Sequence, residues 1–470
     1  MRIDRLSNLD RLMIGASRTW PQDIGALAIL DGTELLDPAG HLRIEALRQS
    51  IESRLHLVPR FRQLIFTPGR LQGGPLWIDD PDFDLNEHVR EHTLPSPGRE
   101  RQLLDAVEQL RKRRLDPRRP LWEMWFLTGL PGDRVGLYVR IHHTVADGIA
   151  AMTTVAAFLD TSVDLPTGPA VSWTPEPAPS SRDLFTDHLT RRLGSLVSLF
   201  TALLHPGATV RRMRTAWPAI RELVAESPST KTSLDQMVGL DRHLALIRER
   251  LDVAKAVGHT HGATVNDILL AATAGGLRAL LQSRGEAVVG TTLRAYAPVS
   301  LRGERHRPQQ GNLIAQMAIP LRLGEADPFR RLRKIATETS ERKARARTSL
   351  GVLIHGRITR RIMLMAVMRQ RVNVATASIP GPTEPLYLMG ARLLEVFPIL
   401  PLIANEPLAV GVLSYAGALN IGITADRDAI PDIEVFTAGV GAELEALGAP
   451  PMPAENLLMS GRQSNNEGSE

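Results

Sequence analysis

A proline-rich segment about a third of the way along the chain sets the main limit on how the protein can fold. Residues Asp164–Arg182 read DLPTGPAVSWTPEPAPSSR, and proline at this density is incompatible with a helix or a central strand. The segment therefore predicts a semi-extended crossing between two separately folded parts. A chain of 470 residues is also too long for one ordinary hydrophobic core and suits two domains of about 200 residues each.

The parts on either side of this segment both mix helical and strand-like patterns, which predicts two α/β (α+β) lobes. The expected first lobe covers residues 1–165, a linker with amphipathic helices covers 166–236, the second lobe covers 237–450, and a disordered tail covers 451–470. No sequence repeat relates the two halves. The clearest patterns predict helices at His41–Leu55, Arg99–Leu115, Thr264–Ser283 and Phe329–Arg347, strands at Gly25–Gly32, Thr291–Leu301 and Asn312–Leu321, and a hairpin at Pro407–Ala425 that turns at Ala416-Gly417.

The composition excludes several classes of function. Hydrophobic residues make up 43% and charged residues 23% of the chain, the balance of a folded globular protein. The lack of cysteine removes disulfides, thiolate metal sites and cysteine nucleophiles together. The net charge of +5 comes mostly from arginine, and because no nucleic-acid-binding signature accompanies it, nucleic acid is excluded as a partner. A basic chain without a signal-peptide pattern predicts a cytoplasmic protein that meets anionic molecules or lipid surfaces peripherally.

Two basic amphipathic runs are candidates for contact with lipid. In the first, apolar residues recur every three or four positions from Leu189 to Leu203, with arginines close by. The second run covers His355–Arg371. Such helices either lie on the inner face of a membrane or on a lipid body, or pack against their own protein, and the sequence leaves both alternatives open.

The stretch Gly136–Met152, GLYVRIHHTVADGIAAM, places two histidines at the junction of a predicted strand and a predicted helix. Because side chains alternate along a strand, His142 and His143 face opposite ways and do not act as a pair. His143 ends the strand, where its side chain can reach a cleft. Asp147 and Gly148 open the helix, since aspartate suits a helix start and glycine permits close backbone approach.

Three interpretations of these histidines compete. Both can be hydrogen-bonded packing residues. His143 and Asp147 can contribute to a metal site, but two ligands of different type do not complete one, so we expect no metal. Alternatively, His143 is a general base, because imidazole takes a proton from an alcohol near cellular pH. With no cysteine and no G-x-S-x-G elbow in the chain, a covalent acyl-enzyme is not expected.

The same residues carry a family resemblance. The pattern H-H-x-x-x-D-G at His142–Gly148 resembles the signature of the CoA-dependent acyltransferase superfamily, which includes chloramphenicol acetyltransferase and peptide-synthetase condensation domains. An ordered series of further segments resembles the bacterial wax ester synthase/diacylglycerol acyltransferase family over nearly the whole chain. Two positions depart from that family's pattern: Arg5 stands where proline is usual, and Ala416 replaces a common Asn or Asp. The segments are LSNLD (Leu6–Asp10), DDPDFDLNEHV (Asp79–Val89), PLWE (Pro120–Glu123), VNDILLA (Val265–Ala271), PVSLR (Pro298–Arg302), GN (Gly311-Asn312), SIPGP (Ser378–Pro382) and LSYAGALNIGITAD (Leu413–Asp426).

This resemblance implies a fold and a mechanism. The fold is two chloramphenicol-acetyltransferase-like lobes joined by a crossover, with the active site in a tunnel between them. His143 is then the general base that deprotonates a hydroxyl, which attacks the acyl-CoA thioester directly within a ternary complex. His142 takes a structural role. Acyl-CoA is a substrate, and no cofactor is implied.

The resemblance also implies roles for residues near the base. Asp147 belongs to the catalytic motif and pairs with an arginine to fix the loop, and Arg302 is our candidate partner. Asn266 and Asp267 match the family's ND pair near the active site. Asn266 either stabilises the developing oxyanion or caps a helix that begins at Asp267. Trp122, in PLWE, is structural or lines the tunnel as a substrate contact.

The resulting hypothesis is an O-acyltransferase that moves a long-chain acyl group from acyl-CoA to diacylglycerol, with a long-chain alcohol as a further acceptor that would yield a wax ester. One alternative is another acyltransferase of the superfamily, acting on a polyketide, a small alcohol or a carrier-bound acyl group. A second alternative is a non-catalytic relative that binds acyl-CoA or lipid. Release of CoA from a free long-chain acyl-CoA distinguishes the three.

Overall fold

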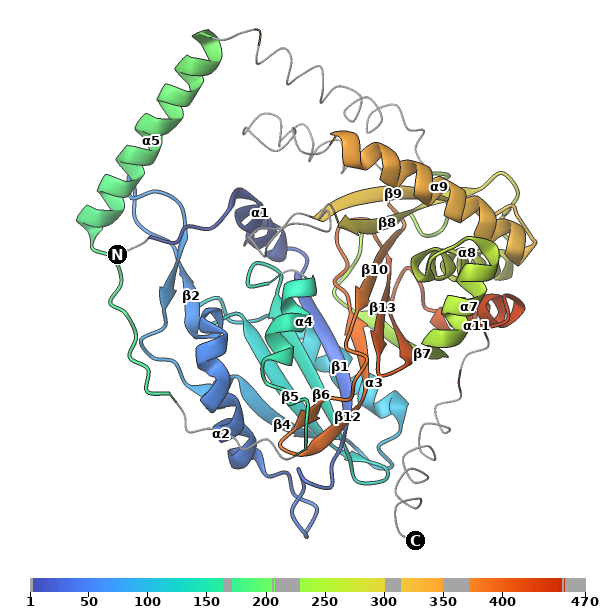
Figure 1. Ribbon diagram of the computed structural model, residues 1–470, viewed down its shortest axis with the longest axis horizontal. Coiled ribbons are helices and arrows are strands. Elements are labelled where there is room, and N and C mark those ends of the chain that lie inside the picture. Colours follow the sequence, from blue (N-terminus) through green and yellow to red (C-terminus); the bar gives the residue numbers. More distant parts are fainter. Residues whose placement is uncertain are drawn as a thin grey trace.

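The computed structural model describes residues 3–146, 148–163, 171–204, 207, 229–300, 314–349, 372–449 and 452, and every structural statement below concerns these residues. Within them the chain forms two six-stranded sheets with helices around them (Figure 1). Several predicted features lie outside the described residues, namely Asp147, Arg302, Gly311-Asn312, the basic run His355–Arg371 and nearly all of the tail 451–470.

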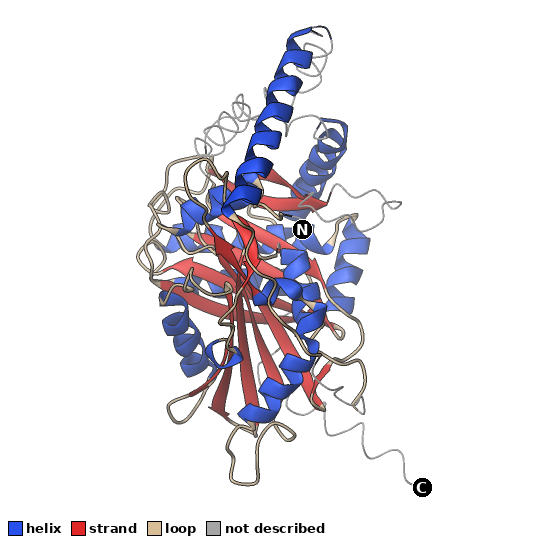
Figure 2. Cartoon of the chain, turned by 90° about the vertical axis from the view of Figure 1, so that its left-hand side faces the viewer, coloured by secondary structure: helices blue, strands red, loops and turns tan. Residues whose placement is uncertain are grey.

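The two sheets stand at the centre of the molecule, most of the helices lie around them, and one long helix projects beyond them (Figure 2). The first sheet has the strand order β11 (Tyr387–Leu388), β12 (Ala391–Ile399), β1 (Asp23–Asp31), β6 (Arg134–His142), β5 (Trp122–Leu130) and β4 (Val89–Thr93). The second has the order β7 (Arg242–Arg250), β14 (Ala418–Asp426), β13 (Leu408–Tyr415), β10 (Val374–Pro380), β8 (Thr292–Ser300) and β9 (Ile314–Arg322). A separate hairpin joins β2 (Gln63–Phe66) and β3 (Leu76–Asp79). The helices are α1 (Asn8–Ser17), α2 (Ile44–Arg54), α3 (Glu100–Lys112), α4 (Gly148–Ala156), α5 (Ser181–Leu204), α7 (Leu251–His261), α8 (Val265–Ser283), α9 (Pro328–Ser349) and α11 (Ile433–Ala446).

These elements confirm the predicted mixed α/β class. The four helices expected from periodicity appear as α2, α3, α8 and α9, and the predicted hairpin appears as β13 and β14. Its turn lies at Ala416 and Gly417, whose φ angles are 45° and 84°. The strand that carries the histidines ends at His142, one residue earlier than predicted.

Strand alternation in β6 separates two apolar layers, as its sequence predicts. Leu137, Val139 and Ile141 face the core that α2 and α4 cover. Tyr138 faces the opposite core, which α3 covers and which also includes Leu244 of the second lobe. The second sheet packs its own core against α8 and α11. Side chains of β13 also enter the first of these cores, so second-lobe residues reach both layers.

One strand pair has the same geometry in both lobes. In the first lobe, β1 and β6 pair antiparallel over nine residues, beginning with Asp23 opposite His142. In the second lobe, β7 and β14 pair antiparallel over nine residues, beginning with Arg242 opposite Asp426. β6 follows its hairpin neighbour β5 and leads into α4, and β14 follows β13 and leads into α11. The lobes thus repeat one structural unit although their sequences show no repeat.

Strand β12 crosses between the lobes. It belongs by sequence to the predicted second lobe, residues 237–450, yet it pairs with β1 in the first sheet, with Ile399 opposite Gly25. The two sheets touch at this crossing, because a Cβ atom on Gly422 of β14 would lie 2.0 Å from the carbonyl oxygen of Pro398 in β12. The predicted boundaries therefore need correction: β11 and β12 lie in the first lobe, since pairing places them at the edge that β1 leaves open.

Helix α3 of the first lobe makes polar contacts with the second lobe. Glu108, whose side chain is 3% exposed, accepts a hydrogen bond from the backbone N–H of Leu244 at 3.0 Å and pairs with Arg427. Arg248 of β7 pairs with Glu100 of the same helix at 2.6 Å. These ion pairs hold the lobes together on the α3 side.

Candidate active site

The chain leaves β6 at the histidine pair and turns before α4 begins. The backbone N–H of His142 donates to the carbonyl oxygen of Leu121 at 2.9 Å, and that of His143 donates to Gln22 at 3.0 Å. The turn is closed by the N–H of Val145, which donates to the carbonyl oxygen of His142 at 2.8 Å. His143 is therefore the first residue beyond the strand, half-buried and held by its backbone at the end of the first sheet.

The imidazole of His142 is buried and engaged at both nitrogens. Its Nε2 lies 2.6 Å from Ser17 Oγ, and its Nδ1 lies 2.8 Å from Thr144 Oγ1. The backbone N–H of Thr144 also donates to Nδ1 at 3.2 Å, which makes Nδ1 an acceptor and assigns the ring proton to Nε2. Burial, together with the neighbouring His143, lowers the pKa of His142 to about 4. The ring is therefore neutral at cellular pH, and neither nitrogen is left for proton transfer.

Charged side chains lie in the core behind His142. Arg140, on the same face of β6, is 2% exposed, and its Nη2 lies 2.8 Å from Glu123 Oε2. Its Nη1 lies 3.7 Å from Asp23 Oδ2. Burial raises the pKa of Asp23, although the Arg140 guanidinium opposes that shift. The guanidinium thus joins β1, β5 and β6 just below the strand end that carries the histidines.

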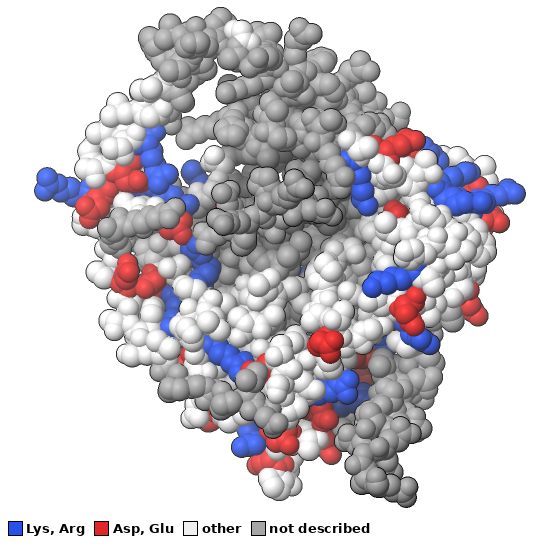
Figure 3. Space-filling view, in the orientation of Figure 1, with Lys and Arg blue, Asp and Glu red and all other residues white. Residues whose placement is uncertain are grey.

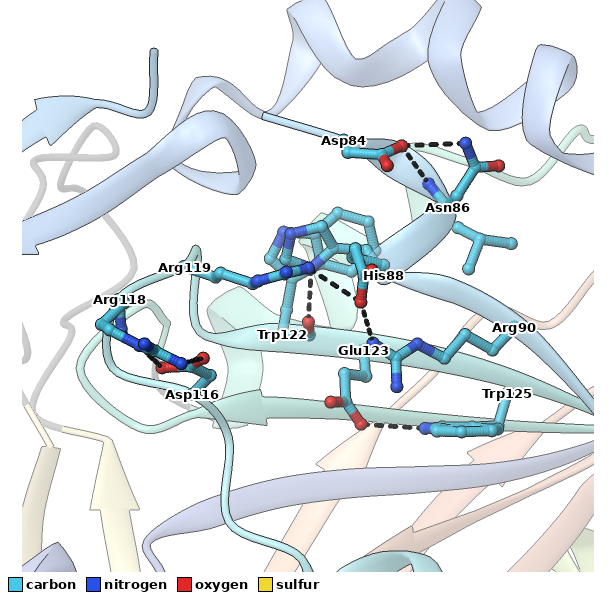
Figure 4. A network of polar contacts seen from close by, with 12 residues as sticks. Asp84, Asn86, His88, Arg90, Asp116, Arg118, Arg119, Trp122, Glu123 and Trp125 are labelled. Atoms are coloured by element: carbon cyan, nitrogen blue, oxygen red, sulfur yellow. Dashed lines mark hydrogen bonds and ion pairs between the residues drawn. The ribbon is translucent and has the colours of Figure 1, made fainter. Parts of the chain in front are cut away.

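Trp122, predicted as a structural residue or a substrate contact, is fully enclosed. Its side chain is 0% exposed, and its ring stacks on Phe61 with a centroid distance of 4.4 Å. It also stacks on His88, with a centroid distance of 4.5 Å (Figure 4). Its Nε1 donates to the carbonyl oxygen of Phe61 at 2.8 Å, and the Nδ1 of His88 lies 2.8 Å from the carbonyl oxygen of Trp122. The structure corrects the predicted substrate contact, because neighbouring rings cover both faces of the indole.

The predicted ND pair lies at the start of α8 in the second lobe. The helix begins at Val265, and Thr264 is its N-cap: the Thr264 hydroxyl accepts from the N–H of Asp267 at 3.3 Å, and Asp267 Oδ2 accepts from the N–H of Thr264 at 2.8 Å. The alternative in which Asn266 caps a helix that begins at Asp267 is therefore wrong. Asn266, half-buried, lies in the first helical turn, where the helix dipole favours negative charge.

The remaining predicted site residues have mixed outcomes. Gly148 opens α4, as predicted. Asp147 and Arg302 lie outside the described residues, so their pairing stays a prediction. Among the residues that the structure describes, no three His, Asp or Glu side chains gather where they could hold a metal ion. In the same part of the chain, we find no helix whose length and apolarity would let it cross a membrane.

The fold is shared with solved structures of known classes. A wax ester synthase/diacylglycerol acyltransferase from Marinobacter aquaeolei VT8 superposes with a TM-score of 0.67 at 23% identity, covering 94% of this chain and 98% of that chain. The first condensation domain of the calcium-dependent antibiotic synthetase gives a TM-score of 0.60 at 16% identity, covering 97% and 98%. At these identities the likeness shows the fold alone, which is the two-lobed fold of acyltransferases and condensation domains that the sequence predicts.

Sequence comparison defines the family. The family model described as "Wax ester synthase/diacylglycerol acyltransferase catalytic domain" matches residues 6–269, and the "WS/DGAT C-terminal domain" matches residues 310–448. The Mycobacterium tuberculosis protein named "Probable diacylglycerol O-acyltransferase tgs1" is 32% identical over 429 residues, 89% of each chain. The protein named tgs2 from the same organism is 28% identical over 445 residues, 92% of this chain and 95% of its own. The chain belongs to the wax ester synthase/diacylglycerol acyltransferase family and is an acyltransferase.

Proposed function

We propose that the protein transfers a long-chain acyl group from acyl-CoA to the free hydroxyl of diacylglycerol, and that a long-chain alcohol serves as a further acceptor. Family membership supports the donor, and the two relatives named as diacylglycerol O-acyltransferases support the acceptor. The observation that carries the mechanism is the position of His143, one residue beyond β6 and beside a histidine whose nitrogens are both hydrogen-bonded.

His143 acts as the general base. Its imidazole takes the proton of the acceptor hydroxyl as the oxygen attacks the thioester carbonyl carbon and forms the new C–O bond. The C–S bond then breaks, and the CoA sulfur leaves with the proton that the imidazolium returns. The products are the ester and free CoA thiol, and no acyl group becomes attached to the protein. Because both substrates react directly, we place them together in a tunnel between the lobes.

A neutral His142 serves this mechanism. A positive charge on that ring would oppose formation of the imidazolium at the adjacent His143. The N–H of Thr144 occupies Nδ1, and Ser17 lies against Nε2, so the buried ring keeps a single proton. We therefore assign His142 a structural role that also preserves the basicity of its neighbour.

We assign stabilisation of the oxyanion to Asn266. This residue lies in the first turn of α8, where the amide side chain and the helix dipole both favour a developing negative charge. We expect Asn266→Ala to lower kcat by about 10²–10³-fold. A steady-state assay with diolein measures the loss, and Thr260→Ala, at an exposed position of the neighbouring helix α7, is the control. A variant with unchanged kcat would remove Asn266 from the mechanism.

Substitution of His143 tests the proposed base. We expect His143→Ala to lower kcat by about 10²–10⁴-fold with diolein and with hexadecanol. Because the chain has no cysteine, a thiol reagent reports the released CoA without background from the protein. His41→Ala, at an exposed side chain, is the matched control. Full turnover by a folded His143→Ala variant would contradict the assignment.

A panel of acceptor substrates tests the proposed acceptor. A panel of diolein, hexadecanol and short alcohols, each with free palmitoyl-CoA, ranks the acceptors. Release of CoA only with a small alcohol would favour the alternative superfamily activity, and binding of palmitoyl-CoA without any release would favour a non-catalytic relative. We further propose that the protein works peripherally, on the inner face of the membrane or on a lipid body, because its acceptors reside there.

A further inference from the structure

Helix α5 stands away from the body of the protein as a single helix of 24 residues (Figure 1). Its first turns are attached to the first lobe through Arg5, whose side chain is 9% exposed. The Arg5 guanidinium pairs with Asp187 at 2.6 Å and donates to the carbonyl oxygens of Gly74 at 2.6 Å and of Leu184 at 3.3 Å. One side of α5 is therefore fixed against the lobe.

The fixed side of α5 holds its acidic residues. Asp183, Asp187 and Arg191 follow one another at four-residue spacing and so share a face. Asp187 binds Arg191 at 2.9 Å in addition to Arg5, and Asp183 accepts a hydrogen bond from Ser180 Oγ at 2.6 Å. Basic and acidic side chains accordingly lie together where α5 meets the lobe (Figure 3). Both carboxylates of this helix are thus engaged within the protein.

The other side of α5 carries an apolar stripe. We call Phe185, Leu189 and Leu193 the outer stripe; they also follow at four-residue spacing, on the face opposite the acidic one. Their exposed fractions are 44%, 46% and 53%. Soluble proteins rarely leave a contiguous row of large apolar side chains in water, and such rows mark contact with a partner or a lipid surface.

Two arginines flank the outer stripe. Arg182 precedes Phe185 by three positions and Leu189 by seven, and Arg192 follows them by seven and three. These spacings place both arginines on the face of the stripe. Both are exposed, and neither forms an ion pair within the part of the chain that the structure describes. The outer face of α5 is therefore apolar and cationic, and the acids of the helix are turned away from it.

We propose that the outer stripe docks on an anionic lipid surface, with Arg182 and Arg192 at the phosphate headgroups and the apolar side chains among the upper acyl chains. The helix then lies in the plane of the surface, as amphipathic helices with this charge pattern do. This inference deepens the proposed function and rests on it for one point: acyl-CoA and diacylglycerol partition into the surface on which the stripe docks.

Charge favours a lipid surface over a second copy of the chain as the occupant. Pairing of two α5 helices by their outer stripes would bring four arginines into one interface. The carboxylates that could neutralise them, Asp183 and Asp187, lie on the opposite side and are already engaged. An anionic headgroup layer supplies the missing negative charge along the whole length of the stripe.

The attachment by Arg5 gives the docked helix a fixed orientation relative to the first lobe. A side chain without a guanidinium at this position could not bind Asp187 or the carbonyl oxygens beside it. The attachment of the helix therefore depends on residue 5.

Vesicle co-sedimentation of the full-length protein tests the proposal. The vesicles contain phosphatidylcholine alone or phosphatidylcholine with phosphatidylglycerol. We expect the triple change Phe185→Ser, Leu189→Ser and Leu193→Ser to lower binding to anionic vesicles by about tenfold or more. We expect Arg182→Gln with Arg192→Gln to lower it by about fivefold per arginine and to abolish the preference for anionic vesicles.

The matched control carries Leu57→Ser and Val289→Ser, two apolar side chains that are 55% and 83% exposed on other parts of the surface. It should bind vesicles as the wild-type protein does. Equal binding by the triple variant, no binding by the wild-type protein, or a dimer in light scattering that the triple change dissociates without altering vesicle binding would each overturn the proposal.

Turnover of a water-soluble short-chain acyl-CoA with a short-chain diacylglycerol separates this test from that of the proposed function. The stripe lies outside the catalytic residues, so the triple variant should retain this turnover while it loses vesicle binding. If the wild-type protein shows no turnover but the vesicle results hold, the acyl-transfer proposal fails and the docking surface stands.

Discussion

The two lobes place different residues at one structural position. At the end of the β1–β6 pair, Asp23 lies opposite His142, and at the end of the β7–β14 pair, Arg242 lies opposite Asp426. Both strand ends receive the same backbone support: the N–H of His142 donates to the residue before β5, and that of Asp426 donates to the residue before β13. Each is followed by a turn and a helix. We call each strand pair with the helix that follows it a frame, so that β1, β6 and α4 form the first frame and β7, β14 and α11 form the second. The two frames have the same backbone arrangement, and their side chains differ.

This difference shows where the chemistry of the protein resides. In the second lobe, Asp426 pairs with Arg242 at 3.1 Å, and the next residue, Arg427, reaches Glu108 of the first lobe. The corresponding position in the first lobe is His143. At this position the second frame carries an arginine whose ion pair joins the lobes, and the first frame carries the candidate base. The fold supplies a position, and the residue that occupies it decides between structural support and catalysis.

Removal of the buried arginine of each frame should have unequal effects. Arg140→Met leaves Glu123 and Asp23 without their cation, so we expect the free energy of unfolding to fall by about 3–5 kcal/mol. Arg242→Met should cost about 1–3 kcal/mol, because Asp426 keeps the backbone N–H groups of Gly239 and Ala429 as donors. Urea denaturation followed by tryptophan fluorescence compares the two. Equal losses would show that the frames are electrostatically alike.

Acid should lower the stability of the protein through the buried imidazole of His142 in the first frame. The pKa of His142 is lowered from 6.5 to about 4. Between these two pH values the unfolded chain therefore binds a proton at this residue and the folded chain does not. Its contribution is complete above pH 6.5 and is lost as the pH falls toward 4, by about 3 kcal/mol in total. His142→Gln lacks this titration. The difference between the unfolding free energies of wild type and variant should shrink over that range, and parallel pH curves would contradict the prediction.

The sequence allowed prediction of what local patterns determine. Strand alternation and the H-H-x-x-x-D-G spacing placed His143 at a strand end, and the T-x-x-D spacing from Thr264 is a local signal for the helix start that the structure shows at Val265. The partners of buried groups could not be predicted in this way. Ser17 reaches His142 across 125 residues, and Trp122 is enclosed by rings from two other segments, because packing between distant segments leaves no local pattern.

Replacement of Arg427, which holds in the second lobe the position of His143, should lower the stability of the protein without lowering its turnover. Arg427→Met removes the cation from Glu108, which keeps its hydrogen bond from Leu244, so we expect a loss of about 1–2 kcal/mol in the free energy of unfolding. Turnover per folded molecule should stay at the wild-type value. Arg118→Met, which breaks a pair at the surface with Asp116, is the control and should change stability little. A large loss of kcat in Arg427→Met would show that the second frame takes part in catalysis.

We expect the smallest effect on stability from a substitution in one of the hairpin turns that lead into the two frames. The β5–β6 turn puts Gly132 and Asp133 at φ angles of 72° and 51°, and the β13–β14 turn puts Ala416 and Gly417 at 45° and 84°. Alanine adopts this left-handed conformation at a cost that asparagine largely avoids, so Ala416→Asn should raise the free energy of unfolding by about 1 kcal/mol. Ala418→Asn, in the adjoining strand, should not stabilise the protein. A lower melting temperature of Ala416→Asn would contradict this account.

The crossing of β12 has a consequence for synthesis of the protein. While the chain leaves the ribosome, β1 has β6 on one side but no neighbour on the other until Ile399 arrives to pair with Gly25. The strand beside the candidate base is thus an open edge during most of translation, and unpaired edges invite association with other chains. Completion of the first lobe depends on a contact of very high sequence separation, which slows folding. A fragment cut at the linker would never receive β12, so the two lobes are products of one continuous chain and not separable modules.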